Sequence, residues 1–219
     1  MEKPDVITPD LRQLLRTLKL GPMAQSMPER IMLARQHNLS YQDFLIQIFS
    51  DEVDRRNNVA GQRRAMRAKL NASMRLENWD ETANISFDRQ LWSRLCTLRF
   101  MKNAYNVILL GPVGVGKTFM ANALGHIACR RTRSVLMTRA DSLFKELKAA
   151  RLQRSYDREM RRFTSVSLLI IDDFGLDQMD AMESRDFYEI IVERHKKHST
   201  IITSNREPAE WLSLMTDST

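Results

Sequence analysis

The stretch GPVGVGKT, residues 111–118, decides the fold of this chain, because it fills every fixed position of the phosphate-loop pattern G-x-x-x-x-G-K-[ST]. The short apolar run NVILL, residues 106–110, precedes it, as expected of a buried parallel strand. The run FMANALGHIAC, residues 119–129, follows it and is predicted to form a helix. A strand, a glycine-rich turn and a helix in this order are the context that the motif requires. We therefore predict an α/β fold with a phosphate site at this turn; the alternative is a glycine-rich turn that binds nothing.

The loop residues have the chemistry to hold ATP. Glycines let the backbone curl so that its N–H groups face the phosphates, and the helix N-terminus adds the positive end of its dipole. Lys117 is predicted to contact the β- and γ-phosphates, and the Thr118 hydroxyl to bind Mg²⁺. The predicted nucleotide-binding residues are Gly111, Pro112, Val113, Gly114, Val115, Gly116, Lys117, Thr118 and Phe119.

Two further apolar runs end in polar residues. The run VSLLII, residues 166–171, is followed by Asp172 and Asp173. We predict that Asp172 holds the Mg²⁺ and that Asp173 orients or deprotonates the attacking water; the alternative is a plain acidic turn. The run STIITS, residues 199–204, ends at Asn205, whose amide is predicted to contact the γ-phosphate or the water. The alternative for Asn205 is an ordinary turn residue.

The composition is that of a globular protein with an anionic partner. The 219 residues are 43% hydrophobic and 28% charged, with a net charge of +7 and a pI of about 9.7. Cys96 and Cys129 lie in apolar helical stretches, so we expect reduced core thiols rather than a disulfide or a metal site. The sequence has no signal-peptide-like start and no apolar run long enough to span a membrane. We therefore expect a cytoplasmic protein.

The chain is predicted to divide into a helical domain over residues 1–78, a connector over 79–101 and an α/β core over 102–219. Thr8 is predicted to cap a first helix and Ser40 a third, with a second helix over residues 23–36. The strand candidate of residues 134–140 is followed by a helix for which Asp141 is the expected cap. Three aromatic residues of the connector are expected to pack between domains, or alternatively one flanks the adenine; they are Trp79, Phe87 and Trp92.

Two basic segments are candidates for contacts with a nucleic-acid backbone. Residues 55–76 carry seven positive side chains and no acid, and they include Arg55, Arg56, Arg63, Arg64, Arg67 and Lys69. The second set is Lys148, Arg151, Arg154, Arg158, Arg161 and Arg162. On one continuous helix this second set would fall within an arc of about 140°. For both segments the alternative is a solvated helix face.

The three motifs together resemble the AAA+ ATPases, and more closely the IstB-like ATP-binding proteins, which are helper ATPases encoded beside the transposase of certain bacterial insertion sequences. The resemblance rests on LRQLLRTLKLGPMAQSM (residues 11–27), LGPVGVGKTFMANALGHIACRR (110–131), LLIIDDFGLDQM (168–179) and KHSTIITSNREP (197–208). It implies a three-layer AAA+ P-loop core with a parallel sheet, preceded by a small all-helical domain. It also implies a homo-oligomer that binds double-stranded DNA, recruits or stimulates a transposase, and uses Mg²⁺-dependent ATP hydrolysis to control release.

The family pattern extends beyond these 219 residues. It includes a fifth strand, an arginine finger and a C-terminal lid, so we expect this stretch alone to bind ATP and to hydrolyse it slowly. Two other functions remain open. One is a loader of a replicative helicase, similar to DnaC. The other is a nucleotide-dependent DNA-binding scaffold with little turnover.

Overall fold

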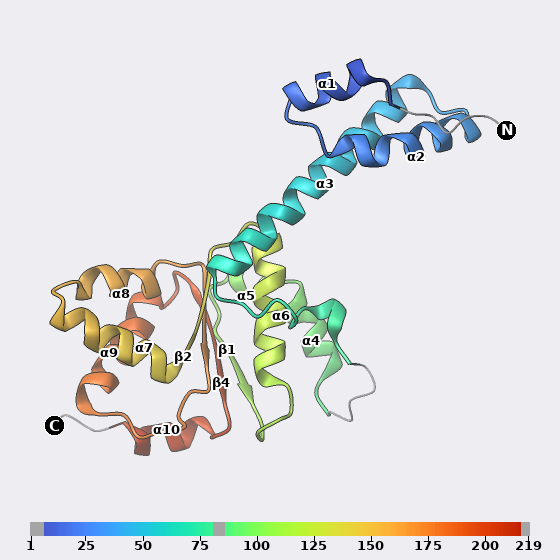
Figure 1. Cartoon of the computed structure of the whole chain (residues 1–219). Coiled ribbons are helices and arrows are strands. Elements are labelled where there is room, and N and C mark those ends of the chain that lie inside the picture. The colour runs from blue at the N-terminus through green and yellow to red at the C-terminus, as the bar shows by residue number, and fades with distance from the viewer. Residues whose placement is uncertain (1–6, 81–85, 216–219) are drawn as a thin grey trace. The chain divides into compact units, whose positions relative to one another are not determined.

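The computed structural model describes residues 7–80 and 86–215, which form two compact units, Met1–Ala60 and Gly61–Thr219 (Figure 1). The boundary lies inside helix α3 (Tyr41–Arg67) and not at residue 78 as predicted. Residues 61–78 pack in the second unit because Ala65, Ala68 and Leu70 belong to its hydrophobic core. The predicted helical domain, connector and α/β core each include residues outside the described ranges, namely 1–6, 81–85 and 216–219.

The first unit is built from α1 (Pro9–Thr17), α2 (Met23–Gln36) and the first part of α3. The predicted N-cap of α1 is confirmed, since the Thr8 hydroxyl accepts the Leu11 N–H at 3.3 Å. Ser40 likewise accepts the Asp43 N–H at 3.1 Å at the start of α3. The apolar faces of these helices meet in a small core of Ile7, Leu15, Met23, Met27 and Ile48.

The second unit contains a parallel sheet with the strand order β1-β4-β3-β2. Its strands are β1 (Val107–Leu110), β2 (Val135–Arg139), β3 (Leu168–Asp172) and β4 (Ser199–Ser204). Because all four strands run in the same direction, their carboxyl ends lie along one edge of the sheet. That edge is where the phosphate loop, Asp172 and Asn205 follow their strands.

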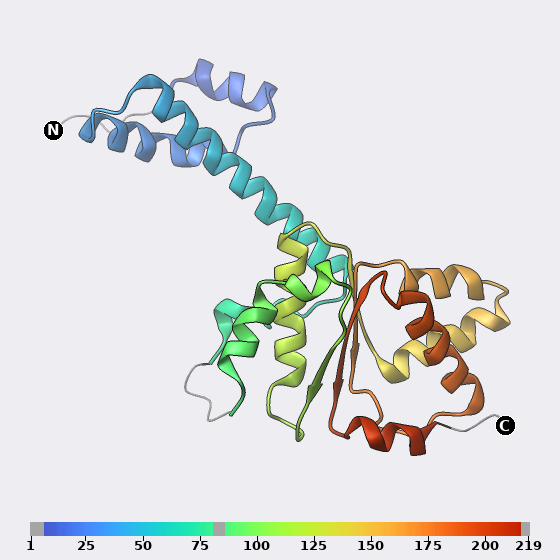
Figure 2. The same cartoon turned by 180° about the vertical axis from the view of Figure 1, so that it is seen from behind.

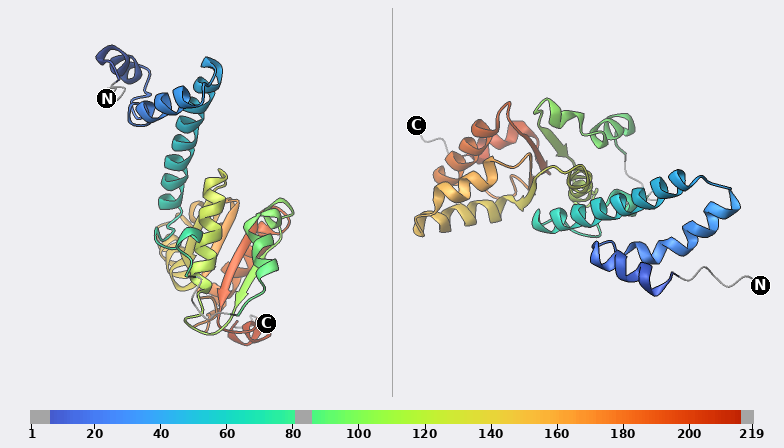
Figure 3. Two further views of the ribbon diagram at one scale, coloured as in Figure 1. Left: turned by 90° about the vertical axis from the view of Figure 1, so that its right-hand side faces the viewer. Right: turned by 90° about the horizontal axis from the view of Figure 1, so that it is seen from above.

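Helices cover both faces of this sheet, which confirms the predicted three-layer architecture (Figures 1 and 2). One face carries α6 (Lys117–Arg130), together with η1 (Leu76–Asn78), α4 (Arg89–Cys96) and α5 (Arg99–Lys102). The other carries α7 (Ala140–Leu152), α8 (Tyr156–Thr164), α9 (Ala181–Arg194) and α10 (Pro208–Leu214). Seen from above in Figure 3, α7 to α9 again lie across the strands from α4.

Strand β3 shows why both layers are needed. Its residues 168 and 170 point into the core beneath α6, whereas residues 169 and 171 point into the core beneath α7 to α9. Successive side chains of a strand face opposite sides of a sheet, so an apolar strand requires cover on both faces.

Three local expectations were wrong. Helix α7 begins at Ala140, with Arg139 at the N-cap position, so Asp141 lies in the first turn and does not cap the helix. The helix then ends at Leu152, and Arg154 adopts a left-handed conformation with φ of 54°, so α7 and α8 are separate. Helix α9 ends at Arg194, earlier than the expected 198, because the chain turns there into β4.

Arg194 occupies a core position although it is charged. Its guanidinium is 1% exposed and donates to the carbonyls of Phe163, Val166 and Ser199 and to the Thr200 hydroxyl. Burial lowers the pKa of Arg194 to about 10, so the group remains charged at neutral pH. The side chain thus ties the segment before β3 to the start of β4.

Helices long and apolar enough to cross a membrane do not occur in the described ranges.

Candidate nucleotide-binding site

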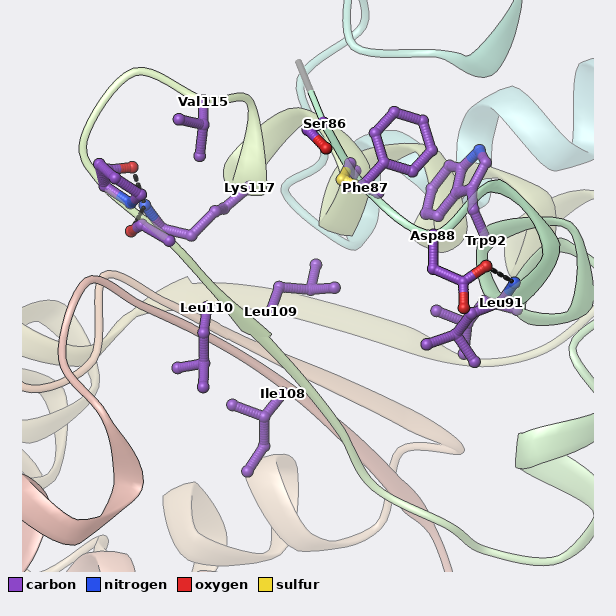
Figure 4. Close-up of a pocket in the computed structure, with 14 residues that line it drawn as sticks. Ser86, Phe87, Asp88, Leu91, Trp92, Ile108, Leu109, Leu110, Val115 and Lys117 are labelled. Atoms are coloured by element: carbon purple, nitrogen blue, oxygen red, sulfur yellow. Dashed lines mark hydrogen bonds between the residues drawn. The ribbon is translucent and has the colours of Figure 1, made fainter.

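The phosphate loop joins β1 to α6 in the predicted strand–turn–helix arrangement. Gly116 precedes α6 with φ of 87°, a left-handed conformation that glycine adopts without strain. The Lys117 ammonium folds over the loop and donates to the carbonyls of Gly111 and Pro112 at 2.7 and 2.6 Å (Figure 4). The loop therefore places a cation and the N-terminus of a 14-residue helix on the same small surface.

The structure brings together the two residues predicted to bind Mg²⁺. The Thr118 hydroxyl lies 3.0 and 3.1 Å from the two carboxylate oxygens of Asp172, which is 5% exposed at the end of β3. A hydroxyl and a carboxylate are hard oxygen donors of the kind that Mg²⁺ prefers. The donor set beside the loop thus fits this cation.

Asp173 points away from Asp172. Its backbone is in the left-handed region with φ of 55°, which turns the chain at the end of β3. Its carboxylate is 36% exposed and lies 3.6 Å from the Arg139 guanidinium. The pair therefore divides into a buried acid next to Thr118 and a partly exposed acid at the rim.

Thr203 orders both acids, and the sequence interpretation missed it. Its hydroxyl, fully buried in β4, donates to Asp172 at 2.6 Å and accepts the Asp173 N–H at 2.9 Å. The only trace in the sequence is a hydroxyl residue within the strand STIITS. The predicted residue, Asn205, is exposed in a bend after β4, and in the described ranges its side chain makes no hydrogen bond.

Arg139, at the end of β2, is a second residue that the sequence interpretation missed. Its guanidinium also binds Asp141 at 3.2 Å, and this hydrogen bond raises the pKa of Arg139. The site therefore has two cations from one chain, Lys117 on the loop and Arg139 beside Asp173.

A cavity of about 370 Å³ opens beside the loop, between β1 and α4 (Figure 4). Its walls include Phe87, Trp92, Leu110, Val115 and Lys117. The cavity is predominantly apolar and ends at the phosphate loop, an arrangement that suits an aromatic base attached to a phosphate chain.

The connector aromatics pack within the second unit, so the expectation that they lie between domains was wrong. Trp79 contacts Phe87 with ring centroids 5.6 Å apart and Phe119 with ring centroids 5.3 Å apart. Phe119 thus takes part in this aromatic cluster at the start of α6. Phe87 and Trp92 border both the cluster and the cavity.

The first basic segment is less one-sided than its sequence indicates. Glu52 lies one turn before it on α3 and pairs with Arg55 and with Arg56, both at 2.7 Å. The hydrogen bond from Arg55 leads the causes that lower the pKa of Glu52 to about 2. The expectation that all these cations lack an acidic partner was therefore wrong.

The other members of this segment differ in their surroundings. Arg64 donates to the Cys129 carbonyl at 2.8 Å, and Lys69 pairs with Glu146 at 2.9 Å. Arg63 and Arg67 are exposed and have no ion pair in the part of the chain that the structure describes. These two arginines are the available cations of the segment.

The predicted 140° stripe does not form, because the break at Arg154 separates α7 from α8. Three of its members are ion-paired: Lys148 with Asp180, Arg151 with Asp186, and Arg162 with Glu146 and Glu159. Three others are exposed and show no ion pair within residues 7–80 and 86–215, namely Arg154, Arg158 and Arg161.

Comparison with known proteins gives a consistent result. The family described as IstB-like ATP binding protein matches residues 13–219. The chain is 37% identical over 210 residues to the ATP-binding protein Rv3427c in an insertion sequence of Mycobacterium tuberculosis, covering 95% of this chain and 84% of that protein. It is 31% identical over 208 residues to the insertion sequence IS21 ATP-binding protein of Pseudomonas aeruginosa, covering 95% and 78%.

Solved structures share the fold of the second unit. The structure of DnaI superposes with a TM-score of 0.56 at 25% identity, covering 65% of this chain and 77% of that one. AMPPCP-bound DnaA from Aquifex aeolicus superposes with a TM-score of 0.55 at 24% identity, covering 68% of this chain and less than half, 46%, of DnaA. The chain therefore has an AAA+ P-loop core and belongs to the family of IstB-like ATP-binding proteins.

Proposed function

We propose that this member of the IstB-like ATP-binding proteins is a Mg²⁺-dependent ATPase that acts on double-stranded DNA together with a transposase. The observation that carries the ATPase part is the contact of Thr118 with Asp172 at 3.0 Å, directly beside a complete phosphate loop. A hydroxyl and an acid brought together from residues 54 apart in the sequence are difficult to explain as a simple turn.

Each residue has a distinct task in this proposal. Lys117 exchanges its two loop carbonyls for phosphate oxygens, and the N-terminus of α6 adds backbone donors. Mg²⁺, when bound by Thr118 and Asp172, would supply positive charge to the phosphates. Asp173 orients the attacking water, and Thr203 fixes the directions of both acids. The cavity beside α4 holds the adenine.

The DNA part is supported by charge and by the relatives. The exposed, unpaired cations Arg63, Arg67, Arg154, Arg158 and Arg161 fit backbone phosphates, since no structural task occupies them. The related proteins named above are described as ATP-binding proteins of insertion sequences. A transposase is therefore the expected protein partner.

Self-assembly on DNA is the remaining part of the proposal. Lys117 alone would have required a cation from a neighbouring subunit, but Arg139 lies 3.6 Å from Asp173 in the same chain. Assembly is therefore supported chiefly by avidity, since each added subunit repeats the same basic residues along one DNA. Light scattering with ATP, ADP or no nucleotide, each with and without duplex DNA, tests it; monomer mass with ATP and DNA present would contradict it.

A helicase loader is the second candidate, because the fold resembles that of DnaI. Affinity capture with a purified transposase on one matrix and a replicative helicase on another distinguishes the two functions. Retention of the chain by the helicase alone would favour the loader.

The direct test of the site compares Lys117→Ala with Lys102→Ala, in which an exposed lysine of α5 is removed. Titration calorimetry with Mg²⁺ and a non-hydrolysable ATP analogue should show binding by the wild type and by Lys102→Ala. Binding by Lys117→Ala should be weakened at least about 100-fold, since a charge-assisted contact with phosphate is lost. Affinity within a few-fold of the wild type would refute the assignment.

A further inference from the structure

Helix α6 holds the main chain of Asn71 with two side chains that lie one turn apart. The Asn122 amide oxygen accepts the Asn71 N–H at 2.9 Å, and the His126 Nε2 lies 2.8 Å from the Asn71 carbonyl. A carbonyl only accepts, so this His126 nitrogen carries the proton. Asn122 and His126 are 1% and 5% exposed. Both polar groups of one peptide residue are thus bound by buried side chains of α6.

Between these two positions, Gly125 makes room for Leu70. A Cβ atom at Gly125 would lie 2.8 Å from Leu70 Cδ2 and 3.0 Å from Ile170 Cδ1. Leu70 is 8% exposed and packs in this core with Leu124. The surface of α6 is therefore shaped to receive residues 70–71.

The residues just before this segment are attached to the same layer. The Met137 N–H of β2 donates to the Ala68 carbonyl at 2.8 Å. Arg64, in the last turns of α3, donates to the Cys129 carbonyl near the end of α6 at 2.8 Å. The C-terminal end of α3 and the chain that follows it are thus fixed to the helix that begins at the phosphate loop.

Asn122 also contacts the first turn of α6. Its amide nitrogen donates to the Thr118 carbonyl at 2.8 Å, while the Thr118 hydroxyl contacts Asp172. One buried amide therefore joins the main chain of Asn71 to the residue that supplies the hydroxyl of the nucleotide site. Both ends of the amide are used, so a shift of Thr118 changes the bond to Asn71.

We propose that Asn122 is a positioning residue that couples nucleotide binding at the phosphate loop to the docking of residues 68–71 at the end of α3. The inference rests on the proposed ATP site. Nucleotide that fixes the first turn of α6 also fixes Asn122, and Asn122 then holds Asn71 more firmly. Coupling of this kind is reciprocal, so loosening Asn71 weakens nucleotide binding by the same factor.

Hydrogen–deuterium exchange with the whole chain tests the coupling. In the wild type, Mg²⁺ and a non-hydrolysable ATP analogue should slow exchange of the amides of residues 68–71 about 10-fold, within the usual range for coupled sites. Asn122→Leu should abolish this nucleotide-dependent change and weaken analogue binding by a similar factor. His126→Leu breaks only the bond to the Asn71 carbonyl, so it should speed the basal exchange and keep most of the nucleotide-dependent change.

The two variants separate coupling from simple stabilisation, because a merely structural role would affect the basal exchange in both. If Asn122→Leu does not fold, Gly125→Ala displaces Leu70 without touching the loop and should weaken analogue binding several-fold. Wild-type affinity in that variant would overturn the proposal, as would undiminished protection in a folded Asn122→Leu. A wild-type chain that binds no analogue refutes the ATP site itself; one that binds it with unchanged exchange at 68–71 refutes only the coupling.

Discussion

Replacing Thr203 by valine tests whether the two acids of the site work as an ordered pair. Valine keeps the shape and the burial in β4 but removes the hydroxyl that bonds to Asp172 at 2.6 Å and to the Asp173 N–H at 2.9 Å. A hydrogen bond to a charged group contributes about 1.5–3 kcal/mol, and an unsatisfied buried N–H costs about 1–3 kcal/mol. Some of this cost destabilises the fold, and the remainder acts on the position of the acids.

We expect kcat for ATP hydrolysis to fall about 10- to 100-fold, because about 1.4 kcal/mol of lost transition-state stabilisation corresponds to a factor of ten. The affinity for Mg²⁺ and ATP should change only a few-fold, since Thr118 still contacts Asp172. Steady-state phosphate release with duplex DNA gives kcat, and titration calorimetry gives the affinity. Thr203→Ser is the matched control, because it restores the hydroxyl and should recover most of the activity. A Thr203→Val protein with wild-type kcat would refute the ordering role.

Further expectations concern the acids, the DNA and the pH dependence. Asp173→Asn should keep ATP binding and lose turnover, whereas Asp172→Asn should weaken Mg²⁺-dependent binding; calorimetry with and without Mg²⁺ separates them, and unchanged turnover in Asp173→Asn would exclude it as the catalytic acid. Arg63→Gln with Arg67→Gln should weaken DNA binding equally for all sequences and lower the salt slope by about 2, measured by fluorescence anisotropy across salt concentrations; a loss confined to one sequence would contradict this. The depressed pKa of Glu52, about 2 against an ordinary 4.5, contributes stability above pH 4.5 that is lost as the pH falls towards 2. Thermal unfolding of the wild type between pH 6 and 3 should show this loss, and a Glu52→Gln protein with the same pH dependence would argue against it.

The sequence predicted the architecture well, because the determining patterns are local. The apolar runs before the loop, before Asp172 and before Asn205 each became a parallel strand, and the boundaries of β4 and α10 agree with the expected ones. The phosphate loop and its helix required only the spacing of glycine, lysine and threonine. Thr118 and Asp172 were correctly assigned to one site, because successive parallel strands end at the same edge.

The parts that failed depend on contacts between distant residues. Lys69 appeared to lack an acidic partner, but it pairs with Glu146, which lies 77 residues later. Arg151 is similarly paired with Asp186, 35 residues away. Thr203 and Arg139 gained their importance only when β4 and β2 were placed beside β3. A periodicity or a charge count along the chain contains none of these distances.

Arg194 imposes an order on the assembly of the second unit. Its acceptors come from the end of α8, the segment before β3 and the start of β4, so they surround the guanidinium only after β3 and β4 have paired. A half-built intermediate in which α9 covers the sheet before that pairing would enclose a cation without acceptors, which is strongly unfavourable. Such intermediates are therefore suppressed, and the two central strands fold together with α9 in one cooperative step. The buried arginine acts as a proofreading element for strand pairing, far from any ligand.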